Sequence, residues 1–476
     1  MATETQDDLL TLASSLSPSL QRYVRISLKN ESPAQLNEML HLLLRHREQP
    51  AAFTQAIAQK FPHPKRRSKL RMQLYEALLD ALARYDRDQQ PDLKLHRIIQ
   101  HCRVLQVRGL NTSGNKLIRK GLKLARKYER KWAVAILTEL RSHLGNLPSS
   151  GGDQRLAGEA MFQESYLAAR EFAELSHLRY CDALMANLFN HEGAVGKNRR
   201  EFFAEMKSKA QKATQRSGFI FPYLGHHLLG NIAFLEDDQP AMSATWEEVG
   251  QLFDQYPHMR VGMEHGYLRA LHFRILMAIS EHDGDRAGQL LGELLHARPK
   301  LARLQPLWCQ TYFSSLGQFA QNLCKPEVLR QFTTTCPDQL SQFAPRMEEV
   351  YVLLIEFLMA SCLYLQEAYE AALRWIHRAL HSERSAMARK TREIMLLIRL
   401  CIYVALEDWD TLETMLPATR KAIARHPVFP EFWEMCDPFF MRLIRDTRKK
   451  AVLKAFQDFE AACQAHFRQG KDQNII

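Results

Sequence analysis

One stretch near the C-terminal end constrains the fold more than any other part of the chain. Residues 346–380 read RMEEVYVLLIEFLMASCLYLQEAYEAALRWIHRAL, with apolar residues at helical spacing on both sides of a short polar break. This pattern predicts a helix, a tight turn and a second helix. Small, aromatic and apolar residues lie where two such helices must meet: Ala360, Tyr369, Ala372, Ile376, Ala379 and Leu380. A hairpin of this kind buries one face only by stacking on neighbours, so the chain should contain further copies.

A second helical hairpin is predicted between Asp92 and His143. Aligned on the first, it places residues of similar kind at the corresponding positions: Cys102, Gly114, Ile118, Gly121 and Leu122. Glycine within a helix costs about 1 kcal/mol relative to alanine, so Gly114 and Gly121 indicate close packing or a helix end. For Gly114, residues 111–113 (Asn-Thr-Ser) could cap a helix that begins there.

Weaker matches extend the pattern along the chain. Leu229-Gly230 and Trp246 fit the two helices of one hairpin, and Ala287 lies in the second helix of another. Prolines interrupt the pattern in two places: Pro337 is expected to separate or bend one helix, and Pro417 to interrupt another.

Composition agrees with an all-α fold. The 476 residues are 46% hydrophobic with only 20 glycines and 19 prolines, and the alternation typical of strands is almost absent. Proline positions and helical periodicity predict an N-terminal helical bundle over residues 1–90. A stacked helical array is predicted over residues 91–440, followed by a C-terminal capping helix and polar tail over residues 441–476.

At these residues the chain resembles the tetratricopeptide-like α-solenoid superfamily. More narrowly, LHRIIQHCRVLQVRGL followed by KLIRKGLKLARKYERKWAVAILTEL is similar to a group of uncharacterised bacterial proteins that pair a small helical head with tetratricopeptide-like hairpins. The resemblance implies a right-handed α-α superhelix of degenerate hairpins, with a concave groove generally used to hold peptides or proteins. It implies no catalytic residues. The spacing of the anchor positions predicts repeats longer than the usual period of about 34 residues.

Several classes of protein are disfavoured by the sequence. The N-terminus, MATETQDDLL, carries acidic residues where a secretory signal would carry basic ones, so we expect a cytoplasmic protein. The longest apolar runs, residues 351–365 and 394–406, contain Glu356 and Arg399 and are shorter than a span of about 20 residues, so no integral membrane segment is expected. Nine cysteines without a C-x-x-C pair favour buried thiols over a zinc site, and no metal or cofactor is expected.

The net charge of +11 directs attention to two basic runs. The first lies at the start of a helix predicted from about Ser68 to Tyr85 and contains no acidic residue: Lys60, Lys65, Arg66, Arg67, Lys69 and Arg71. A cationic helix entrance suits phosphate on DNA, RNA or lipid, and residues 51–85 also fit a helix-turn-helix. An ordinary solvated face, with some pairing to acids elsewhere, explains the same residues.

The second basic run is predicted to fill most of the outward circumference of one helix. Glu129 alone opposes it locally, and its members are Lys116, Arg119, Lys120, Lys123, Arg126, Lys127, Arg130 and Lys131. An anion-binding stripe and an exposed solenoid face share this spacing.

Other candidate sites have simpler explanations. Residues 191–198 (HEGAVGKN) lack the four-residue glycine spacing of a phosphate-binding loop. His226-His227 are adjacent on a helix and therefore point to different faces, which is poor metal geometry. An aromatic set could line a peptide groove but is more typical of a core: Phe219, Phe221, Tyr223, Trp246, Phe253 and Tyr256.

The leading hypothesis is therefore a non-enzymatic scaffold that binds a protein or peptide through the concave face of a helical-repeat solenoid. The alternative is a nucleic-acid-binding regulator that uses the two basic runs. Both hypotheses are carried forward because the sequence does not decide between them.

Overall fold

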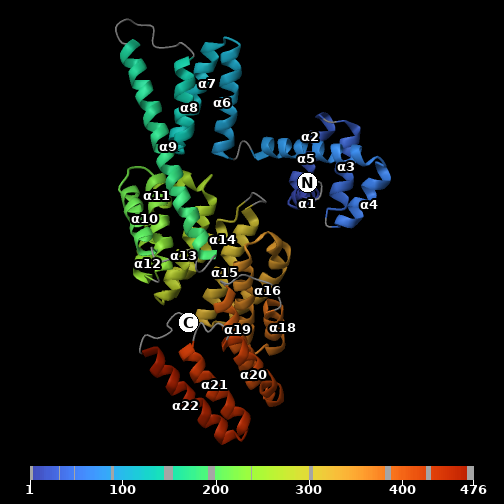
Figure 1. Ribbon diagram of the computed structural model, residues 1–476, viewed down its shortest axis with the longest axis vertical. Helices are drawn as coiled ribbons and strands as arrows, with labels where there is room; N and C mark the ends of the chain where they lie inside the picture. The colour runs from blue at the N-terminus through green and yellow to red at the C-terminus, as the bar shows by residue number, and fades with distance from the viewer. Residues whose placement is uncertain are drawn as a thin grey trace. The chain divides into compact units, whose positions relative to one another are not determined.

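The regular secondary structure in the part of the chain that the computed structural model describes is helical (Figure 1). The described residues are 4–31, 33–47, 49–86, 90–143, 154–190, 199–236, 238–299, 304–380, 388–424 and 430–468. They contain 22 α-helices and no β-strand, which confirms the predicted all-α class. Within the same ranges, no helix has both the length and the apolar character needed to cross a membrane.

The chain divides into two compact units. The first comprises Met1–Leu184, Arg200–Ala270 and Pro299–Gln305. The second comprises Met185–Arg199, Leu271–Arg298 and Pro306–Ile476.

The first unit begins with a bundle in which α5 contacts each of the other four helices. Its helices are α1 (Glu4–Ser14), α2 (Pro18–Glu31), α3 (Ala34–Arg45), α4 (Pro50–Lys60) and α5 (Pro64–Asp86). Their apolar faces share one core that includes Met39, Phe53 and Leu74. α5 begins one turn earlier than predicted, because Pro64 occupies the first helical position, where its missing N–H costs nothing.

A second core in this unit is formed by three antiparallel helices and a long fourth one. They are α6 (Pro91–Val107), α7 (Asn111–Lys127), α8 (Lys131–His143) and α9 (Gln154–Asn190). A Cβ at Gly121 would lie 2.8 Å from Leu137 Cδ1 and 2.9 Å from Ile98 Cγ2, so glycine permits the close approach of α7 to its neighbours. The predicted helix start at Gly114 is wrong, because α7 already begins at Asn111.

The remaining helices of the first unit pack around aromatic side chains. They are α10 (Arg199–Thr214), α11 (Ile220–Leu235), α12 (Gln239–Gln255) and the first part of α13 (Glu264–Ser280). Phe219 packs against both Phe253 and Tyr256, and a Cβ at Gly230 would lie 2.8 Å from Trp246 Nε1. Five of the six aromatic residues considered above are buried, and Tyr256 is half-buried. They therefore form core and do not line a groove.

The second unit continues as packed helix pairs. Its helices are α14 (Gly284–His296), α15 (Gln305–Leu323), α16 (Pro326–Phe343), α17 (Glu349–Leu365), α18 (Tyr369–Leu380), α19 (Ala388–Ala405), α20 (Trp409–Ala424), α21 (Pro430–Arg445) and α22 (Lys449–Arg468). The helices predicted within residues 346–380 are present as α17 and α18, which pack against each other. Among the residues aligned between hairpins, Tyr369 is half-buried. The buried ones are Cys102, Gly114, Gly121, Gly230, Ala287, Ala360, Ala372 and Ala379.

Neither Pro337 nor Pro417 ends its helix. Pro337 lies inside α16 and Pro417 inside α20, and both helices continue through the proline. A proline removes one hydrogen bond, but buried side chains on both sides of it, such as Phe332 and Leu340 in α16, hold the helix against its neighbours.

A long-range cap joins the α7–α8 turn to the start of α11. The Glu129 carboxylate accepts hydrogen bonds from the backbone N–H groups of Phe219 (2.7 Å) and Ile220 (2.9 Å). Glu129 itself has a left-handed backbone with φ of 50°. Gly218, at φ of 93°, lets the chain pass so close that a Cβ there would lie 2.8 Å from the carboxylate. A negative charge at a helix N-terminus satisfies free amides and the helix dipole together.

Replacing Glu129 with glutamine should lower the free energy of unfolding by about 1–2 kcal/mol, because the charge on this cap is lost. Chemical denaturation followed by tryptophan fluorescence measures the loss, and hydrogen exchange should accelerate at the amides of Phe219 and Ile220. Glu413→Gln, which removes a charge from an exposed position of α20, is the control. Equal stability of the two variants would contradict the role assigned to this cap.

Candidate functional site

α7 presents its cations on one face. Ile118, Leu122 and Ala125 are buried on the opposite side. The exposed residues, which we call the α7 cationic face, are Lys116, Arg119, Lys120, Lys123, Arg126 and Lys127. Their helical angles fall within about a third of the circumference at 100° per residue, so the positive charge is concentrated on a single stripe.

Most of the α7 cationic face has no acidic partner. Arg126 pairs with Glu164 of α9, and the Lys127 ammonium lies 5.4 Å from the centre of the Tyr128 ring. The other four members make no ion pair with any residue that the structure describes. No aspartate or glutamate occurs between Asp92 and Glu129 in the sequence. Residues adjacent in sequence therefore do not neutralise the charge of α7.

The second basic run does not occupy one helix as predicted. α7 ends at Lys127, and the left-handed turn at Glu129 directs the next two cations elsewhere. The side chain of Arg130 is only 7% exposed, and its Nε donates to Asp92 Oδ1 at 2.8 Å. Lys131 begins α8 and pairs with Glu171 of α9 at 2.7 Å. Both residues are therefore structural.

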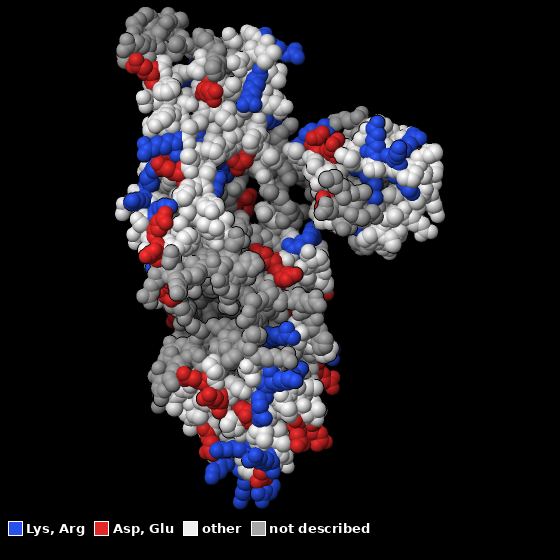
Figure 2. All heavy atoms as spheres, viewed as in Figure 1, with Lys and Arg blue, Asp and Glu red and all other residues white. Residues whose placement is uncertain are grey.

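The first basic run lies within the first turns of α5, except for Lys60, which ends α4. Lys65, Arg66 and Lys69 are exposed, whereas Arg67 and Arg71 are half-buried. The Arg71 guanidinium lies 5.6 Å from the centre of the Phe53 ring, and burial together with the charge of Arg67 lowers its pKa. No acidic residue occupies the first turn, so the cations and the helix dipole add to one positive potential. Figure 2 shows Lys and Arg side chains gathered on the visible face of this bundle.

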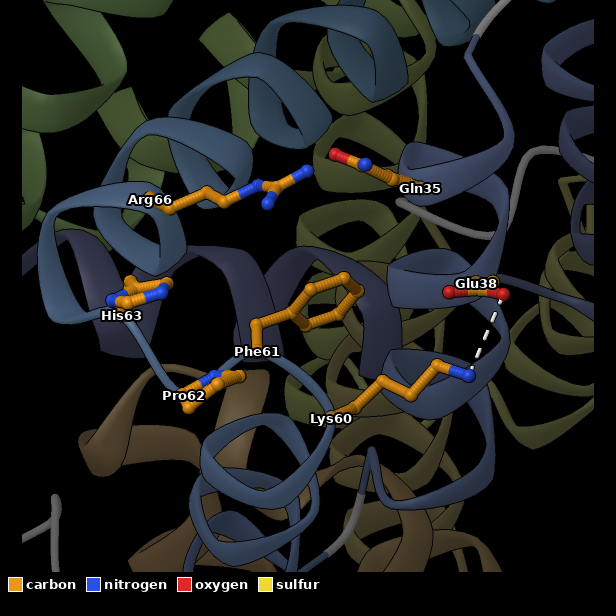
Figure 3. Close-up of a pocket in the computed structure, with 7 residues that line it drawn as sticks. All are labelled: Gln35, Glu38, Lys60, Phe61, Pro62, His63 and Arg66. Carbon is orange, nitrogen blue, oxygen red and sulfur yellow. Dashed lines mark ion pairs between the residues drawn. The ribbon is translucent and has the colours of Figure 1, made fainter.

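A small cavity adjoins the start of α5. Its volume is about 210 Å³ and its lining residues are Gln35, Glu38, Lys60, Phe61, Pro62, His63 and Arg66. Figure 3 shows Arg66 extended toward Gln35 and Lys60 extended toward Glu38, with the Phe61 ring between these pairs. The Lys60–Glu38 distance is 3.5 Å, so this member of the first basic run is already paired with an acid.

One polar network in the first unit was not anticipated. Asp182 of α9 accepts hydrogen bonds from His227 Nδ1 (2.9 Å) and Asn231 Nδ2 (2.8 Å) of α11, and Arg269 donates to Asn231 Oδ1 at 3.2 Å. Burial raises the pKa of Asp182, but its bonds to His227 and Asn231 and the charges of His227 and Arg269 outweigh burial, so the net pKa is lowered. His227 and Asn231 are buried. This network therefore joins helices and offers no open site.

Buried cysteines give no sign of a reactive thiol, and the described ranges hold no candidate metal cluster. Burial raises the pKa of the Cys102 and Cys401 thiols to about 11, which keeps them protonated and unreactive near neutral pH. Among the residues described above, no group of three or more His, Cys, Asp or Glu side chains is placed to hold a metal ion. The glycine-containing segment 191–198 lies outside the described residues.

Comparison with known proteins finds no family model and no curated protein that matches this chain.

Arg130→Gln should lower the free energy of unfolding by about 1–2 kcal/mol. The substitution breaks a largely buried ion pair, although Asp92 keeps partial access to water. Lys123→Gln, on the exposed face of α7, should change it by less than about 0.5 kcal/mol. Urea denaturation measures the free energy of unfolding of both variants. Equal losses would contradict the conclusion that Arg130 is structural and Lys123 is not.

Proposed function

We propose that this protein is a non-enzymatic helical-repeat binding protein whose exposed cations on α7 and at the start of α5 hold a phosphate-rich partner. One observation carries the proposal: Lys116, Arg119, Lys120 and Lys123 share one exposed stripe and have no acidic partner among the described residues.

The surrounding acids make this observation more specific. Three nearby carboxylates are already paired: Asp92 holds Arg130, Glu171 holds Lys131, and Glu164 holds Arg126, which is one member of the face itself. Glu129 caps α11. Cations without an acidic neighbour keep the positive potential that attracts phosphate.

A right-handed superhelix of tetratricopeptide-like hairpins is the architecture that we propose for this scaffold. Its support is local: α19 packs against both α17 and α18, as each new hairpin must when it covers the previous one. The small residues Ala360, Ala372 and Ala379 belong to the core that these three helices share.

Nucleic acid is the direct probe of the cationic surfaces. Lys116→Gln, Lys120→Gln and Lys123→Gln together should weaken binding to RNA or duplex DNA. The dependence of log K on log salt concentration should fall by about 0.9 for each lysine that contacts a duplex phosphate. Fluorescence anisotropy across a salt series measures both quantities.

The matched control neutralises three exposed lysines of α22, Lys449, Lys450 and Lys454. Neutralising Lys65, Arg66 and Lys69 in the same assay measures the contribution of α5. If the α7 and α22 variants lose affinity equally, general positive charge explains the binding and the α7 proposal fails.

A protein partner is the second candidate, and an exposed apolar face on α9 favours it. Phe162 is 68% exposed and stacks on Tyr166, and Tyr180, on the same side of the helix, is also exposed. Exposed aromatic patches on folded proteins mark interaction surfaces. The concave groove has less support, because α15 and α17 bury side chains around most of their circumference.

Phe162→Ser with Tyr166→Ser should release a protein that co-purifies with the wild type, because two aromatic anchors are lost. Affinity purification followed by mass spectrometry compares this variant with Leu453→Ser and Phe456→Ser, which alter another exposed apolar pair on α22. Retention of the same partner by the α9 variant would contradict this second candidate.

A further inference from the structure

The turn between α6 and α7 exposes aliphatic side chains. Val107 is 87% exposed, Leu110 is 51% exposed and Val104 is 48% exposed. Gly109, at φ of 68°, forms the sharp part of the turn. We call these three aliphatic residues the α6–α7 tip. Exposing three aliphatic side chains to water within seven residues at the end of a hairpin is unfavourable unless a partner covers them.

Other hairpin turns of the same chain provide a comparison. The α17–α18 and α19–α20 turns also contain one left-handed residue, but here it is an acid, Glu367 at φ of 58° and Glu407 at φ of 53°. Each exposes only one leucine, Leu365 at 42% and Leu406 at 43%. A helical hairpin can therefore be closed with polar, acidic residues, so the apolar α6–α7 tip is not required by the turn.

Positive charge surrounds the α6–α7 tip. Arg103 and Arg108 are both exposed beside the aliphatic residues. Lys116, the first member of the α7 cationic face, follows Leu110 by about 9 Å along the helix axis. An apolar end with a cation at that height suits an anionic bilayer, in which an inserted apolar face lies about 5–10 Å deep at the boundary of headgroups and acyl chains.

The residue types favour a bilayer over nucleic acid at this place. Proteins that hold single strands stack bases on aromatic rings, yet no aromatic residue or histidine occurs between Cys102 and Lys127. Phosphate contacts on a duplex would use the lysines and arginines but would leave Val107 and Leu110 in water. A membrane surface uses both features at once.

We propose that the α6–α7 tip inserts into the surface of an anionic bilayer while Arg103, Arg108 and Lys116 bind its headgroup phosphates, and the more distant members of the α7 cationic face add longer-range attraction to the negative surface. This inference rests on the proposed function, because it assigns the phosphates that the α7 cations hold to lipid. The protein would dock peripherally, with the turn as its point of insertion.

Vesicle co-sedimentation of the full chain tests the proposal. The probes are vesicles of phosphatidylcholine alone and vesicles of an equal mixture of phosphatidylcholine and phosphatidylglycerol, with RNA binding measured in parallel. The wild type should prefer the mixed vesicles. Val107→Ser with Leu110→Ser should weaken vesicle binding at least about tenfold, because two aliphatic side chains no longer leave water, and should leave RNA binding unchanged. Leu365→Ser with Leu406→Ser, at the two comparison turns, should leave both unchanged.

The outcomes separate this inference from the proposed function. Neutralising Lys116, Lys120 and Lys123 should weaken binding to mixed vesicles, by about fivefold for each lysine near the headgroups. If the variant with Val107→Ser and Leu110→Ser binds vesicles as the wild type does, insertion is overturned. If the wild type binds RNA but not mixed vesicles, the inference fails and the phosphate-binding function stands. If it binds neither, both fail. Far-UV circular dichroism verifies that each variant retains its helices.

Discussion

Close approach of neighbouring helices at small residues is the constraint on which the rest of this structure depends. A helical hairpin buries one face internally and exposes another, so each added pair must cover the one before it. Gly121 brings α7 against Leu137 and Ile98, and Gly230 admits the Trp246 ring. Ala360 and Ala372 are completely buried in the core shared by α17, α18 and α19. A larger side chain at Gly121 or Gly230 would force the neighbouring side chains to move.

That same packing determines where charge can remain free. Residues near the end of α7 belong to connections between helices: Glu129 reaches α11, Arg130 reaches Asp92 on α6, and Lys131 reaches Glu171 on α9. These contacts use the acids that could otherwise neutralise α7. The outward stripe is left positive because the acids nearby are engaged in holding helices together.

Much of this arrangement could be predicted from local sequence, and the reason is periodicity. The spacing of Ile118 and Leu122 was sufficient to place the cations of α7 on its outer face, and residues 346–380 indicated both α17 and α18. The role of Glu129 could not be predicted in this way, because its partners lie 90 and 91 residues away. Arg130 looked like one more cation of the run because no local pattern marks Asp92 as its partner. The His227 and Asn231 pair, four residues apart on an apolar helix, was the one local signal of the buried network with Asp182.

Repulsion between the cations of the α7 cationic face lowers the stability of the helix, which favours a binding role for these residues. Lys116 and Lys120 are four residues apart, as are Arg119 and Lys123, and like charges at this spacing each destabilise a helix by about 0.2–0.5 kcal/mol. Burial of the opposite face offsets this repulsion, since a fully buried leucine or isoleucine contributes about 1.5–3 kcal/mol, and Ile118 and Leu122 are both buried there. α7 is therefore held by its packing and not by its surface, so its exposed residues are free to serve a partner. A phosphate-bearing surface that neutralises the stripe would remove the repulsion on binding, and this relief would add to the affinity of the contact.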